Sequence, residues 1–187
     1  MKKIVIATLA LMSSLAFAGT ATFEGSKVNG LDGAKDAMST NFAISETVNK
    51  TFSVHTQLTS QQSDGTNAVS TRLEVGGTAT VPVYGPVTGY TRVAIGQKFS
   101  TAGSGQFTYY SIEPGLSVPL SSSLTAKVGY RFRTAADNPN VNKDTTDTVR
   151  VGVSYALNKQ HAVGVRYDRM TGDSRNDSVN IFVTRSF

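Results

Sequence analysis

The sequence predicts an all-β protein: a transmembrane, antiparallel, up-and-down β-barrel of about ten strands, with eight or twelve strands as alternatives. Three observations predict it. Apolar and polar residues alternate with a period of two along most of the chain, short turns alternate with longer polar loops, and an export signal precedes the first strand. Bacterial outer-membrane barrels combine alternating strands with this pattern of turns and loops.

Residues 1–18 have the layout of a signal peptide. Lys2 and Lys3 begin it, residues 4–12 form a short apolar run, and Ala16-Phe17-Ala18 is a small-x-small cleavage site. The apolar run is too short to span a bilayer as a helix, which takes about 20 residues. We therefore expect cleavage after Ala18 and one outer-membrane barrel domain over residues 19–187.

Ten segments of the mature chain alternate as half-buried strands do. The clearest covers residues 123–134, where Val128 and Phe132 share one face and Lys127 and Arg131 share the other. The expected strands lie at residues 20–26, 38–47, 50–60, 69–80, 87–99, 106–118, 123–134, 147–157, 161–170 and 179–187. Four short turns separate them in pairs: Asn49-Lys50, Val83-Tyr84-Gly85-Pro86, Ser121-Ser122-Ser123 and Asn158-Lys159-Gln160. The longer polar connections are residues 27–37, 61–68, 100–105, 135–146 and 171–177.

A soluble β-sandwich is the alternative fold, because its strands alternate as well. Three features favour the membrane barrel. The polar faces are rich in Gly and Arg, the chain ends in Phe187, and aromatic residues stand near the strand ends on the apolar faces. Those aromatic residues are Phe52, Phe99, Tyr110, Phe132, Tyr155 and Tyr167. Phe187 resembles the C-terminal signal read by the barrel assembly machinery, although Arg185 stands where an apolar residue is usual, and we expect Arg185 to snorkel to the interface.

The polar faces must point into the barrel, because lipid cannot satisfy their hydrogen bonds. This places eight cationic side chains in the lumen: Arg72, Arg92, Lys98, Lys127, Arg131, Arg133, Arg150 and Arg166. The counter-charges are Glu24, Glu74, Glu113 and Asp168. Because Arg131, Arg150 and Arg166 lie at similar distances from their turns, we expect them to form one cationic track.

Two functions fit this lumen, and the sequence leaves both open. A pore lined by Arg and Lys favours anions by electrostatic attraction, which predicts a small porin-like channel for small anionic solutes. Alternatively, Glu74, Glu113 and Asp168 pair with the cations and close a narrow, non-conducting structural or surface-interaction barrel. Glycines on the inward face either open a path or make room for long arginines. They are Gly76, Gly96, Gly115, Gly129, Gly152 and Gly164.

Catalysis is a weaker hypothesis, and we predict that the protein is not an enzyme. The two histidines, His55 and His161, have no Ser or carboxylate at a recognisable catalytic spacing. No clustering of His or Cys predicts a metal site, and nothing in the sequence calls for a cofactor. The expected partners are outer-membrane lipid, the barrel assembly machinery and small anionic solutes; nucleic acid is not expected, because the cations lie inside the barrel.

Residues 106–187 resemble the oligogalacturonate-specific porins, a family of small channels for acidic sugars. The resemblance is carried by Glu113-Pro114-Gly115-Leu116-Ser117, Val128-Gly129-Tyr130-Arg131-Phe132-Arg133, Arg166-Tyr167-Asp168 and Phe187. It implies a narrow barrel with an arginine track made of Arg131, Arg133, Arg150 and Arg166. Members of that family have twelve strands, whereas this sequence predicts ten.

Overall fold

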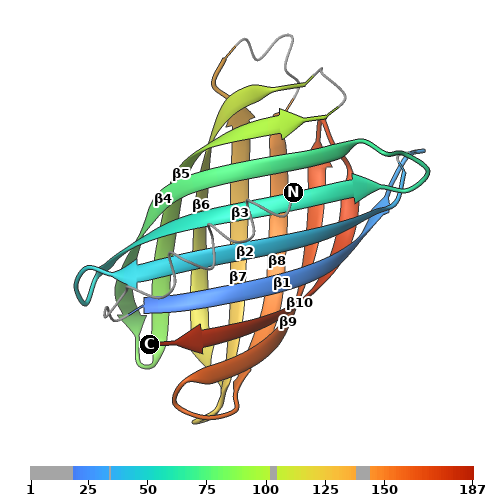
Figure 1. The fold of residues 1–187 in the computed structure, drawn as a ribbon. Helices are drawn as coiled ribbons and strands as arrows, with labels where there is room; N and C mark the ends of the chain where they lie inside the picture. Colours follow the sequence, from blue (N-terminus) through green and yellow to red (C-terminus); the bar gives the residue numbers. More distant parts are fainter. Residues whose placement is uncertain (1–18, 34, 102–104, 138–143) are drawn as a thin grey trace.

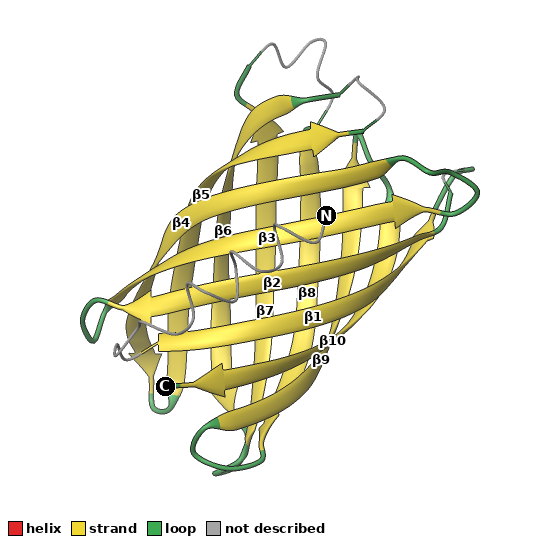
Figure 2. Cartoon of the chain, viewed as in Figure 1, coloured by secondary structure: helices red, strands yellow, loops and turns green. Residues whose placement is uncertain are grey.

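The structure, a computed structural model, describes residues 19–33, 35–101, 105–137 and 144–187. It is one closed antiparallel barrel of ten strands, tilted around a common axis (Figure 1). Figure 2 shows only strands and their connections in this part of the chain. Among these residues no helix is long and apolar enough to cross a membrane. The predicted signal peptide lies outside the described residues.

The ten expected segments each correspond to one strand, which confirms the predicted fold class and strand number. The strands are β1 (Gly19–Gly30), β2 (Ala37–Thr47), β3 (Phe52–Ser63), β4 (Val69–Tyr84), β5 (Val87–Ser100), β6 (Phe107–Pro119), β7 (Leu124–Ala135), β8 (Thr146–Ala156), β9 (His161–Gly172) and β10 (Asn176–Ser186). Each strand pairs with the next one in sequence. The barrel closes where β1 pairs with β10, in a register that sets Phe23 opposite Val183.

Several strands extend beyond the predicted limits, mostly at the end of the barrel where the longer loops lie. β1 continues to Gly30, opposite Asn176 of β10, through residues that we expected in loops. The apolar–polar pattern is weak there because the outward residues Lys27 and Asn29 are polar and exposed, although Val28 between them is buried. Backbone pairing with the neighbouring strand continues. At the opposite end, β4 continues to Tyr84, so that the predicted four-residue turn shrinks to Gly85-Pro86, with Gly85 at φ 53°.

The apolar side chains lie on the outside of the barrel. Ile181 in the middle of β10 is 66% exposed and Phe23 on β1 is 57% exposed, as are large apolar side chains all around the wall. Inside, the described part of the barrel has a single small apolar cluster of Phe107, Tyr109 and Ala135. A soluble sandwich buries its apolar faces against each other, so this arrangement excludes the sandwich alternative.

Both described ends of the chain meet at the short-turn end of the barrel. The backbone amide of Phe187 donates to the carbonyl of Gly19 at 3.0 Å, beside the junction of β1 and β10. The guanidinium of Arg185 lies 5.3 Å from the centre of the Phe187 ring. We expected Arg185 to snorkel to the membrane interface; the structure places it against the terminal aromatic ring as a cation–π pair.

Candidate functional site: the charged lumen

All eight cations named from the sequence line or approach the lumen, but the space around them differs between the two ends. The half nearer the short turns holds two cavities of about 430 and 380 Å³, both lined by Arg92, Lys127, Arg150 and Arg166. The half nearer the long loops holds a cavity of only about 100 Å³, lined by Arg72, Tyr109 and Arg133 among others. Where the described residues line it, the lumen is therefore wide on the short-turn side and constricted on the long-loop side.

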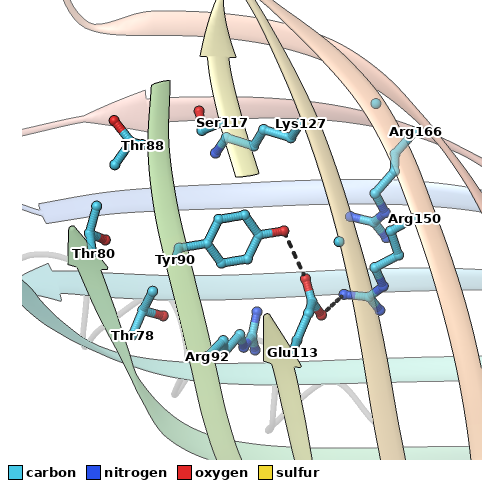
Figure 3. Close-up of a pocket in the computed structure, with 12 residues that line it drawn as sticks. Thr78, Thr80, Thr88, Tyr90, Arg92, Glu113, Ser117, Lys127, Arg150 and Arg166 are labelled. Carbon is cyan, nitrogen blue, oxygen red and sulfur yellow. Dashed lines mark hydrogen bonds and ion pairs between the residues drawn. The ribbon is translucent and has the colours of Figure 1, made fainter. Parts of the chain in front are cut away.

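A chain of ion pairs crosses the middle of the lumen from β6 to β1. Arg150 Nη1 donates to Glu113 at 2.6 Å (Figure 3), and its Nε lies 3.7 Å from Asp168. Arg166 continues the chain, with contacts of 2.7 Å to Asp168 and 2.9 Å to Glu24. These side chains are largely buried, and paired burial is what makes charges in a narrow lumen tolerable.

A second group of polar contacts surrounds Glu74 on β4. Arg92 donates to Glu74 at 2.6 Å and to Gln57 at 2.7 Å. The hydroxyl of Tyr109 donates to the other oxygen of Glu74 at 3.4 Å, and His55 Nε2 lies 3.9 Å from Glu74. His55 is only 6% exposed. This histidine packs beside an arginine–carboxylate pair, and its Nε2 atom has no hydrogen-bond partner among the described residues.

The constriction is built around a carboxylate that the sequence analysis missed. Asp144 lies 2.7 Å from Arg133 and 3.9 Å from Arg72, and the Arg133 guanidinium lies 5.5 Å from the centre of the Tyr109 ring. Asp144 and Arg133 are 2% and 3% exposed. We expected residues 135–146 to form a solvated loop. Of its described residues, Ala136, Asp137 and Thr145 are exposed, whereas Ala135, Asp144 and Thr146 are buried. Asp144 could have been found from the alternation along β8. Thr146, Thr148 and Arg150 all face the lumen, and Asp144 lies two residues before Thr146, so the same alternation places it inside as well.

The arginines of the predicted cationic track lie in one region of the lumen, but acidic side chains contact two of them. In the sheet register, Arg150 stands opposite Asp168, and Arg131 stands opposite Thr148, so strand tilt offsets the arginines from one another. The carboxylate of Asp168 lies between Arg150 and Arg166 and contacts both. The structure thus brings these arginines into one region but interleaves them with acidic side chains.

Three of the eight cations form no ion pair with the described residues. Lys98 lies over the ring of Phe107, at 5.0 Å from its centre. Arg131 is partly buried near the constriction. Lys127 is exposed to the space inside the barrel and lines both of the larger cavities.

Inward glycines make room for side chains from neighbouring strands. A Cβ at Gly96 would lie 2.4 Å from the Tyr109 ring, and Cβ atoms at Gly115 and Gly164 would lie 2.3 Å from Tyr90 and 2.2 Å from Phe182. These close approaches need the absence of a side chain. The sequence left open whether the glycines open a path or hold side chains; at these positions they hold aromatic rings against the wall.

Comparisons with known proteins identify the fold but no family. No family model matches the chain, and no curated protein matches it. Among solved structures, an outer-membrane channel from Pseudomonas putida F1 is similar at 7% identity and a TM-score of 0.58, covering 93% of this chain and 97% of that chain. The translocator domain of the autotransporter NalP from Neisseria meningitidis is similar at 11% identity and a TM-score of 0.53, covering 100% and 94%.

The KdgM porin, solved with disordered oligogalacturonate, is similar at 13% identity and a TM-score of 0.50, covering 90% of this chain and 99% of that chain. The structural resemblance to an oligogalacturonate porin that the sequence suggests is therefore confirmed at the level of the fold. These three solved structures are an outer-membrane channel, a translocator domain and a porin. This chain has the fold of a bacterial outer-membrane β-barrel.

Proposed function

We propose that this protein is a small porin-like channel of the bacterial outer membrane that passes small anionic solutes. The observation that carries the proposal is the charge of the lumen wall. Eight cationic side chains face five carboxylates, Asp144 being the fifth, so the wall keeps an excess of positive charge after every carboxylate is paired. A basic wall at close quarters attracts anions and repels cations.

The cavities support passage through the short-turn half. They are large enough to hold water and small solutes, and their polar lining is that of a wet lumen rather than a packed core. The apolar outer wall fits outer-membrane lipid, and insertion by the barrel assembly machinery follows from the same proposal. Similarity to porins and an outer-membrane channel supports it at the level of the fold.

Reversal potentials across a planar bilayer test the proposal. With a KCl gradient, the purified mature barrel should conduct chloride in preference to potassium. Arg131→Ala should lower that preference by about twofold, because a unit charge about 10 Å from the ion in a water-like dielectric contributes roughly 0.4 kcal/mol. Arg169→Ala is the matched control, since Arg169 is exposed on the outer face beside Asp177.

A non-conducting barrel is the second candidate, and the constriction favours it. Arg133, Asp144 and Tyr109 are almost completely buried and leave little free space on the long-loop side. In that case the ion pairs serve to fill a narrow barrel, as the side chains of small barrels do. Bilayers that contain folded barrel but show no current above the leak of protein-free bilayers, at any salt concentration, favour this candidate and reject the channel.

A further inference from the structure

We propose that Lys127, with the hydroxyl groups of Ser117 and Thr88, forms an oxyanion-binding site in the wide half of the lumen. The site would take the carboxylate or phosphate group of a small solute that enters from the short-turn end. This proposal deepens the proposed function and rests on it for transport, but binding at the site is a separate property of the folded barrel.

Lys127 is the cation in the wide half whose charge is not already neutralised. Arg92, Arg150 and Arg166 line the same two cavities, but each is bound to a carboxylate at 2.6–2.9 Å. Lys127 forms neither an ion pair nor a hydrogen bond with the residues that the structure describes. It is also the one exposed side chain of the eight cations, and the space that exposes it is the lumen.

The neighbours of Lys127 offer hydrogen-bond donors. Ser117 stands opposite Lys127 in the sheet register, and Thr88 stands opposite Ser117, so the three side chains follow one another across β7, β6 and β5. Figure 3 shows the Lys127 amine reaching towards this part of the wall. The hydroxyls of Ser117 and Thr88 have no partner among the described side chains, whereas those of Thr22 and Ser26 elsewhere in the lumen are paired.

The residue opposite Lys127 on its other side is a glycine, over which the aliphatic part of the Arg166 side chain packs. Gly152 of β8 stands opposite Lys127 and lines both larger cavities. On the next strand Arg166 stands opposite Gly152. A lysine ammonium beside free hydroxyls can bind an oxyanion through charge-assisted hydrogen bonds, which are stronger than neutral ones.

Arg131 is the nearest rival, and its surroundings favour it less. It also lacks an ion pair, but it lines the constricted cavity of about 100 Å³ and is only partly exposed. A solute would need to displace the packed side chains there. Lys127 instead lines both of the larger cavities, where free volume already exists.

Binding of inorganic phosphate to the mature barrel in zwitterionic detergent micelles tests the site. We expect phosphate to bind, as seen by broadening of its ³¹P NMR signal, and Lys127→Gln to weaken binding at least about tenfold because one charge-assisted contact is lost. Lys127→Arg should keep most of the affinity. Lys159→Gln removes the same charge from an exposed turn at the same end of the barrel and should bind like the unmodified protein.

The variants must first be shown to fold, by the heat-dependent shift of barrel mobility on a gel. Equal phosphate affinity in Lys127→Gln and in the unmodified barrel, or no phosphate binding to the unmodified barrel, overturns the site. If phosphate binds through Lys127 but the bilayers carry no current, the site stands and the channel function is rejected. If the bilayers pass anions and Lys127→Gln changes neither phosphate binding nor selectivity, the channel stands and the site is rejected.

Discussion

At the scale of the residue, the free charge and the free space of the lumen depend on which charged side chains form ion pairs. Parity along each strand was enough to predict that Arg150 and Glu113 face inward. Their pairing was not predictable, because Arg150 lies on β8 and Glu113 on β6, with β7 between them. The tilt of the strands decides which residues of two non-adjacent strands lie at the same height along the barrel axis. The same limit explains why the sequence suggested a row of arginines where the structure alternates arginines with carboxylates.

Asp144 gives a test of this buried pairing. Asp144→Asn leaves Arg133 almost fully buried without a counter-ion, so we expect the free energy of unfolding to fall by about 3 kcal/mol. Urea unfolding in lipid vesicles would measure it by circular dichroism, since the chain has no Trp for fluorescence.

Asp32→Asn is the matched control for the Asp144→Asn substitution. Asp32 pairs with Arg175 at 2.9 Å, but both side chains are more than half exposed, and Asp32 has φ 55°, which Asn tolerates. We expect its unfolding curve to match that of the unmodified protein. Similar curves for Asp144→Asn and Asp32→Asn would mean that the buried pair contributes little to stability.

At the scale of the element, strand identity was almost fully predictable and strand ends were not. Period-two alternation exists only where one face meets lipid and the other meets the lumen. It therefore located all ten strands but not the polar extensions such as residues 27–30 of β1. The side-chain contacts between strands were not predictable either. Nothing in the sequence around Gly96 indicates that the Tyr109 ring of the next strand lies over it.

Glycine substitutions test these contacts between strands. Gly96→Ala places a methyl group within 2.4 Å of the Tyr109 ring, where something must shift, and we expect a loss of about 1–3 kcal/mol in the free energy of unfolding. Gly25→Ala, on the outer face of β1, meets nothing within 4 Å and should change stability little. The same urea titration compares the two variants. Equal stability of both would show that the ring moves aside without cost.

At the scale of the whole molecule, the outward apolar wall determines where the protein can be stable. Ile181 lies at the centre of β10 with its side chain outside the barrel. Ile181→Lys should cost about 2–4 kcal/mol of folding free energy in a bilayer, as cations at the midplane of barrels do. Val48→Lys, at an exposed turn, should cost at most about 1 kcal/mol.

Folding of both lysine variants into vesicles, followed by gel mobility, checks this expectation. A midplane lysine at position 181 that costs no more than the turn lysine would mean that this part of the wall does not face acyl chains. Such a result would contradict the membrane assignment of the barrel as a whole, not merely of β10.

The junction of β1 and β10 has a consequence for biogenesis. Thr22 and Thr184 share a hydrogen bond across a separation of 162 residues, so the last ladder to form joins the first strand synthesised to the last. Until β10 arrives, the sheet has two unpaired edges, which invite pairing with other chains. If the protein is exported to the outer membrane as proposed, the nascent polypeptide needs protection during its whole transit of the periplasm. Loss of its final strand should then yield aggregates rather than a smaller barrel.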